Sequence, residues 1–235
     1  LQGYISYAKG KKVDEIIIFA TSILREIGNS NKVIELIKKE TGYDIDLISE
    51  EREADFALVS AQACFDLKNS NNVIFDMGGG SCEIVYVEKD KVKFKNSYKF
   101  GIAKVNKQFN IDVDFTFENE KILLKYFNEI LSPIVKNISH VDMLICTSSL
   151  LKLLGFIFYK NKKDIYELKN KTISKEQCKY VIKNMDKIDI EDDRRDTIWI
   201  GSIFLKVFMN LLKIEAACIC PWSIREAYIQ LKVID

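Results

Sequence analysis

The sequence contains little histidine, and its cysteines are not paired at short spacing. His140 is the one histidine, so we expect neither a histidine-rich metal site nor a serine–histidine hydrolase, and we expect His140 to be a loop residue. No two of the six cysteines are separated by the two residues typical of zinc knuckles and dithiol redox centres. We therefore expect free thiols and a cytoplasmic location.

Long hydrophobic runs and an excess of one charge are also missing. The most apolar stretch, residues 198–212, is interrupted by Lys206 and is shorter than the roughly 20 residues that cross a bilayer. The first residues lack the apolar core of a signal peptide, and the chain starts at Leu1, which indicates a trimmed or partial sequence. With 35 basic and 34 acidic residues, the net charge of +1 gives no global field for nucleic acid or a membrane. Any anionic ligand must be held by a local site.

Strands and helices alternate in the first part of the chain. Residues 15–20 and 44–49 have the pattern of short strands, and helices are predicted from Ser30 to Gly42 and over 50–67. The polar run 68–72 is the best candidate for a domain boundary, because no other stretch resembles a linker.

Three consecutive strands are predicted next. They cover 72–77, 82–90 and 91–100, joined by a turn at Gly78–Gly80 and by an antiparallel turn at Lys89–Asp90. The later predictions, in chain order, are a short helix after Gly101, a long amphipathic helix ending near Pro133, a strand at 141–146, a helix capped by Ser174 and Gln177, a helix over 191–212, a strand at 215–220 and a helix from Trp222. The sequence therefore predicts an α/β protein with mixed sheets.

The residues with the clearest chemistry are Asp76, Gly78, Gly79, Gly80 and Ser81, between two of these strands. Three successive glycines let the backbone turn sharply and bring several N–H groups against an oxyanion with no Cβ in the way. A strand rather than a helix follows, which distinguishes the segment from a Walker A loop. From the residues alone, a phosphate clamp and a glycine-rich hairpin turn with an exposed aspartate both remain open.

Five segments together resemble the exopolyphosphatase / guanosine pentaphosphate phosphohydrolase family. DMGGGSCE (76–83) is similar to the family's second phosphate motif, with Cys82 in place of the usual Thr. The other four, in matching order and spacing, are FATSILREIGNS (19–30), LISEEREADF (47–56), RRDTIWIGSIFL (194–205) and WSIREAYI (222–229). The resemblance covers essentially the whole chain.

The resemblance implies an actin-like ATPase fold of two lobes with the site in the cleft between them. Residues 1–69 would form the first lobe, 70–221 the second lobe with the phosphate loop, and 222–235 a helix returning to the first lobe. The family's first phosphate hairpin has no counterpart, so we expect an incomplete first lobe and little activity from 1–235 alone.

Family roles can be carried over residue by residue. Arg25 matches an arginine that grips substrate phosphate, and Glu53 matches the proposed general base, although in the charge run from Glu50 to Glu53 a solvated surface glutamate would otherwise be favoured. Asp76 and Glu83 resemble carboxylates that organise Mg²⁺ and water. Gly78, Gly79, Gly80 and Ser81 would face the phosphate, and we expect Cys82 to be a small core residue rather than a nucleophile.

The implied activity is Mg²⁺-dependent hydrolysis of the terminal phosphate of polyphosphate or of guanosine pentaphosphate, a stringent-response nucleotide. Three departures from the family pattern, at Glu50, Arg52 and the segment 146–149, keep a non-catalytic polyphosphate- or alarmone-binding regulator as an alternative. A sugar or acetate kinase is disfavoured by the short chain. No nucleic-acid or membrane partner is expected, and the sequence leaves open whether a homodimer forms.

Overall fold

The computed structural model describes residues 1–111, 115–160 and 164–234. By contacts along the backbone the chain divides into two compact units, Leu1–Glu53 and Ala54–Asp235. The division lies in the fourth helix, earlier than the predicted boundary near residue 69. The predicted domain ranges 1–69, 70–221 and 222–235 stay a prediction.

The smaller unit is built on a two-stranded parallel sheet. Its elements are α1 (Gln2–Gly10), β1 (Ile18–Ala20), α2 (Ser22–Glu26), α3 (Ser30–Thr41) and β2 (Ile45–Leu47). Strand β1 pairs with β2 from Ile18↔Ile45 onward. Helix α3 ends as predicted at Gly42, whose φ of 77° is a left-handed conformation that glycine adopts without strain. Neither α1 nor α2 was predicted, because their residues show no strong helical periodicity.

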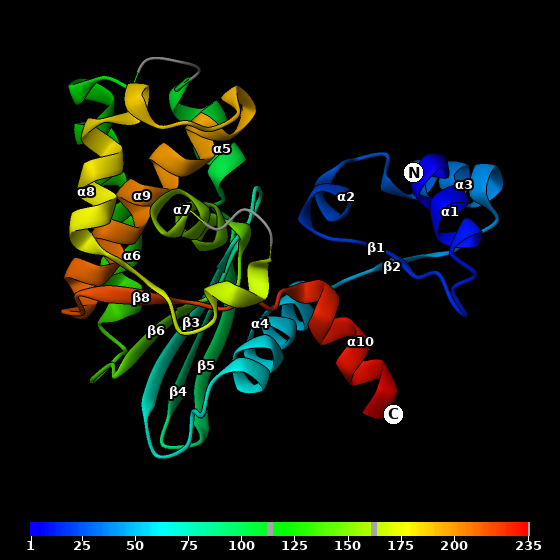
Figure 1. Ribbon diagram of the computed structural model, residues 1–235, viewed down its shortest axis with the longest axis horizontal. Helices are drawn as coiled ribbons and strands as arrows, with labels where there is room; N and C mark the ends of the chain where they lie inside the picture. The colour runs from blue at the N-terminus through cyan, green and yellow to red at the C-terminus, as the bar shows by residue number, and fades with distance from the viewer. Residues whose placement is uncertain (112–114, 161–163, 235) are drawn as a thin grey trace. The chain divides into compact units, whose positions relative to one another are not determined.

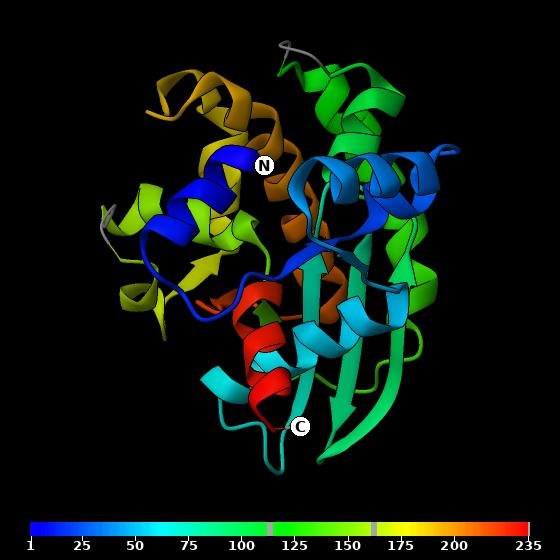
Figure 2. The same cartoon turned by 90° about the vertical axis from the view of Figure 1, so that its right-hand side faces the viewer.

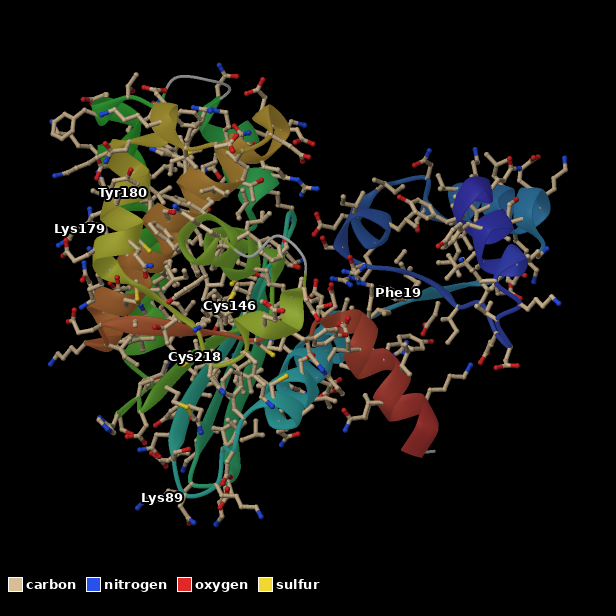
Figure 3. The ribbon with its side chains drawn as sticks, viewed as in Figure 1. Phe19, Lys89, Cys146, Lys179, Tyr180 and Cys218 are labelled. Carbon is tan, nitrogen blue, oxygen red and sulfur yellow. The ribbon has the colours of Figure 1, made fainter. Side chains whose placement is uncertain are left out.

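The larger unit contains a six-stranded mixed sheet in the order β5-β4-β3-β6-β8-β7 (Figure 1). Its strands are β3 (Asn71–Met77), β4 (Cys82–Glu88), β5 (Lys91–Tyr98), β6 (Met143–Cys146), β7 (Thr172–Ser174) and β8 (Ala216–Ile219). The β4–β5 connection is the predicted turn: Lys89 and Asp90 have φ of 46° and 69°, the twist that tight antiparallel hairpins need. Figure 3 shows Lys89 at the tip of this hairpin.

Helices cover both faces of this sheet. The helices are α4 (Glu50–Cys64), α5 (Ile102–Phe109), α6 (Phe117–Val135), α7 (Ser149–Tyr159), α8 (Lys175–Lys183), α9 (Asp192–Leu212) and α10 (Ile224–Ile234), with 3-10 turns η1 (Ile165–Leu168) and η2 (Met185–Lys187). Helices α6 to α9 pack against one face of the sheet and form the main core with it. The predicted capping box of Ser174 and Gln177 is present at the start of α8. Of the helices in the described ranges, none has the length and apolarity that a bilayer crossing requires.

The opposite face of the sheet carries α4 and α10. Ala54, Ala57 and Ala61 of α4 pack against the strands, because small side chains let the helix lie close. Helix α10 lies beside α4 (Figure 2), where the Phe56 and Tyr228 rings stack with centroids 5.5 Å apart. Strand side chains alternate between the two faces, which decides where the site residues of β3 and β4 point.

Candidate active site

The glycine segment forms a closed loop between β3 and β4. The Gly78 N–H donates to the Ser81 carbonyl over 2.9 Å, and Ser81 is buried. Residues 78–81 turn the chain from β3 into the antiparallel β4, and neither Gly78 nor Gly79 has a left-handed φ. At Gly78 an added Cβ would lie 3.3 Å from the Ser81 carbonyl oxygen. Close approach of backbone, rather than φ, therefore favours glycine at position 78.

Asp76 and Glu83 form a directly opposed pair on neighbouring strands. The β3–β4 register matches Asp76 with Glu83, so both side chains point to the face that α4 covers. The Thr147 hydroxyl donates to Asp76 Oδ2 over 2.8 Å. Burial raises the pKa of the Asp76 carboxyl, and the Thr147 hydrogen bond and the charge of Lys152 oppose that rise in part.

Glu83 is more enclosed than Asp76. Its side chain is buried, and Oε1 accepts a hydrogen bond from the Ser97 hydroxyl over 2.7 Å. Mg²⁺ needs few protein carboxylates because it keeps several waters, and within the described ranges no cluster of three acidic, cysteine or histidine side chains surrounds the pair. The donor set of two neighbouring carboxylates, one of them half-buried, fits a magnesium ion bound through Asp76 with Glu83 beside it.

Arg25 and Glu53 are brought together within the smaller unit. Arg25 lies at the end of α2, and its Nη2 lies 2.5 Å from Glu53 Oε2 on the first turns of α4. The guanidinium also donates through Nη1 to the Ile48 carbonyl. Both side chains are largely buried, at 15% and 12% exposed. Glu53 is thus a held, partly buried carboxylate and not the solvated surface charge that its neighbours in the sequence suggest.

The departures at Glu50 and Arg52 have local explanations. The Ser49 hydroxyl accepts the Arg52 N–H over 3.2 Å and so caps α4, and acidic side chains such as Glu50 in the first turn are favoured by the helix dipole. The Arg52 guanidinium donates to both carboxylate oxygens of Asp46, over 2.7 and 2.8 Å. Its charge is therefore neutralised within the unit.

The third departure, Cys146 to Ser149, supports Asp76. Parallel pairing of β3 with β6 aligns Phe75 with Cys146, which brings Thr147 beside Asp76. Sequence reasoning missed this role of Thr147, because nothing local specifies the register of two strands about 70 residues apart in the chain. Cys146 lies inside the unit (Figure 3), and burial raises the pKa of its thiol to about 12.

The predictions for Cys82 and His140 are confirmed. Cys82 is fully buried in the main core, on the sheet face opposite Glu83, and burial raises the pKa of its thiol well above the ordinary value. Such a thiol is a poor nucleophile. His140 is an exposed loop residue 3.0 Å from Asp142.

A small pocket adjoins the glycine loop. It has a volume of about 220 Å³ and lies within the larger unit. Its walls include Gly78, Gly79, Ala103, Ser149 and the start of α9, namely Arg194, Asp196 and Thr197. The α9 residues fall in a segment that resembles the family, but no site role was predicted for them, since position along a helix does not reveal a pocket.

Comparison with known proteins gives one consistent family. The sequence matches the Ppx/GppA phosphatase family over residues 1–233. It is 23% identical over 231 residues to exopolyphosphatase 1 of Mycobacterium bovis and of Mycobacterium tuberculosis, covering 93% of this chain and 67% of each relative. It is 25% identical over 213 residues to a bifunctional 3-dehydroquinate synthase/phosphatase of Fusobacterium nucleatum, covering 83% of this chain and 31% of that protein.

Solved structures agree on the fold. An exopolyphosphatase from Cytophaga hutchinsonii superposes with a TM-score of 0.86 at 20% identity, over 99% of this chain and 79% of that one. The Ppx/GppA protein of Aquifex aeolicus gives 0.79 at 21% identity, over 99% and 78%. The predicted α/β actin-like fold with mixed sheets is confirmed. The chain belongs to the Ppx/GppA phosphatase family.

Proposed function

We propose that the protein hydrolyses the terminal phosphoanhydride of inorganic polyphosphate or of guanosine pentaphosphate. The observation that carries the proposal is the glycine loop: its Gly78 and Gly79 carbonyls accept hydrogen bonds from the Ile102 and Lys104 N–H groups, over 2.9 and 3.2 Å. A trans peptide directs its N–H opposite to its carbonyl. The N–H groups of Gly79 and Gly80 thus point away from these bonds and suit a phosphate oxygen.

Asp76 and Glu83 would hold Mg²⁺ beside the loop. When bound, the ion supplies positive charge to the phosphate oxygens as negative charge shifts during phosphoryl transfer. Thr147 fixes one oxygen of Asp76, so the carboxylate keeps a single orientation. Glu83 is buried and bonded to Ser97, which keeps the second carboxyl group beside Asp76 and away from solvent.

In the reaction, a water oxygen forms a bond to the terminal phosphorus while the bridging P–O bond breaks. Glu53 accepts the water proton, and the products are orthophosphate and a chain one phosphate shorter. Arg25 keeps the Glu53 carboxylate in place through their ion pair. An arginine has five N–H donors, more than the bonds of Arg25 to Glu53 and to the Ile48 carbonyl use.

A phosphate-release assay on the complete protein tests the proposal. With Mg²⁺ present, polyphosphate, guanosine pentaphosphate and ATP are supplied in separate reactions. We expect orthophosphate from at least one of the first two at a rate well above that from ATP. Tight binding without release would instead support a regulatory binding protein, and neither binding nor release would contradict both.

A further inference from the structure

Gly101 is the N-cap residue of α5, and its identity is not explained by its own backbone. Its φ of −149° and ψ of 165° are extended values that any residue adopts. A Cβ on Gly101, however, would lie 2.5 Å from the Gly79 carbonyl carbon and oxygen and 2.6 Å from the Gly80 nitrogen. These are backbone atoms, so they cannot rotate aside as a side chain could. Glycine at position 101 therefore lets α5 lie directly against the glycine loop.

The first turn of α5 is bonded to the loop as well as packed against it. The N–H groups at the start of a helix have no partner within the helix. Here the Ile102 N–H donates to the Gly78 carbonyl and the Lys104 N–H donates to the Gly79 carbonyl. Two consecutive peptide planes of the loop are thereby fixed by α5. The direction of the Gly79 and Gly80 N–H groups follows from that contact.

Helix α5 is itself anchored away from the loop. The Asn106 side-chain amide donates to Asp196 Oδ2 over 2.6 Å, and Asp196 is held in turn by the Thr197 N–H. Ile102 and Val105 are buried in the main core. The position of α5 is thus set by α9 and the core, which makes the helix a fixed support rather than part of a movable loop.

We infer that Gly101 is a positioning residue, through which α5 presets the Gly79 and Gly80 N–H groups for phosphate oxygens. The inference rests on the proposed function, since presetting matters only if the loop binds phosphate. A merely structural role would make Gly101 one more packing glycine. The two roles predict different effects of an added methyl group. A packing glycine would lose only stability, whereas a positioning glycine would also lose loop geometry and substrate binding.

The test compares Gly101→Ala with Gly155→Ala in the complete protein. An added Cβ at Gly155 would meet only side-chain ends, Ile219 Cδ1 at 2.9 Å and Leu168 Cδ1 at 3.0 Å, in the core. Gly101→Ala should lower kcat/KM for polyphosphate about 10²-fold, the effect of a displacement of about 1 Å at a site, mainly through KM. Gly155→Ala should stay within about twofold of wild type, even where its melting temperature falls.

Amide hydrogen exchange supplies a readout that does not depend on activity. In Gly101→Ala, the Ile102 and Lys104 amides should exchange at least about tenfold faster, while the β4–β5 hairpin keeps its protection. Asn106→Ala removes the hydrogen bond to Asp196 without adding a Cβ near the loop. It should give smaller changes of the same sign in amide exchange and in kcat/KM, and it replaces Gly101→Ala as the test if that variant does not fold. Wild-type exchange and kcat/KM in both variants would overturn the inference. If the wild-type protein releases no phosphate, the proposed function fails, and the exchange data still decide whether α5 holds the loop.

Discussion

Glu53→Gln removes one negative charge from the smaller unit while keeping the shape of the side chain. Glu53 and Arg25 are 2.5 Å apart and at most 15% exposed, so the pair is screened by solvent only in part. Glutamine can still accept a hydrogen bond from Arg25, so the expected loss of stability is the difference between a charged and a neutral hydrogen bond, about 1 kcal/mol. Loss of a general base lowers rates by about 10² to 10⁴-fold. We therefore expect kcat to fall at least about 10²-fold in a protein that remains folded.

The assay is orthophosphate release at saturating polyphosphate and Mg²⁺, with unfolding by urea measured in parallel. Glu50→Gln is the matched control, because it makes the same chemical change at an exposed position three residues earlier on the same helix. A kcat for Glu53→Gln within about threefold of wild type would refute the role of Glu53. An equal loss in Glu50→Gln would show that charge near the start of α4, and not this carboxylate, matters.

Three further substitutions test the remaining site residues. Asp76→Asn should make the magnesium-free protein more stable at pH 7. Because burial raises the pKa of Asp76 in the folded state, the folded protein binds more protons than the unfolded protein at pH values between the ordinary and the raised pKa. The stability of the wild-type protein therefore falls as pH rises through that window, and the stability of the variant should not. The same variant should lose at least about 10²-fold in Mg²⁺-dependent phosphate release, since a metal ion contributes several kcal/mol to such reactions. Equal stability of variant and wild type at all pH values would contradict the first expectation, and undiminished phosphate release would contradict the second. Thr147→Val removes the hydroxyl bonded to Asp76 and should raise the Mg²⁺ concentration for half-maximal rate by about 10 to 100-fold, whereas an unchanged requirement would show that Asp76 needs no such support. Arg25→Lys keeps the charge but cannot reach Glu53 and the Ile48 carbonyl with one planar fork, so kcat/KM should fall about tenfold or more; full activity would mean that a point charge suffices.

Local signals in the sequence were sufficient for much of the larger unit. The turn at Lys89–Asp90, the capping box at Ser174 and the long helix α9 each depend on residues a few positions apart, and the structure has all three. The short strand β7 was missed because three residues before a helix cap give too little alternation. Family resemblance, rather than periodicity, identified Arg25 and Glu53.

Tertiary contacts account for what could not be predicted. Arg25 pairs with Glu53 across 28 positions, and Thr147 reaches Asp76 across 71. Each depends on how separate elements pack, which no local pattern specifies. Gly101 looked like a simple break before a helix, and only its distance to the loop backbone explains why no side chain fits there.

Gly79→Val tests most directly whether the glycine loop is the phosphate-binding element. A Cβ at Gly79 would make ordinary contact with Ala103 Cβ at 3.6 Å, and the two further methyl groups of valine would occupy space beside the loop, where the pocket is only about 220 Å³. The measurement is KM and kcat for polyphosphate in the variant and in wild type, at equal concentrations of folded protein with Mg²⁺. If the loop binds phosphate, KM should rise at least about tenfold, the effect of losing about 1.4 kcal/mol of binding. An unchanged KM would contradict the phosphate-binding role of residues 78–81.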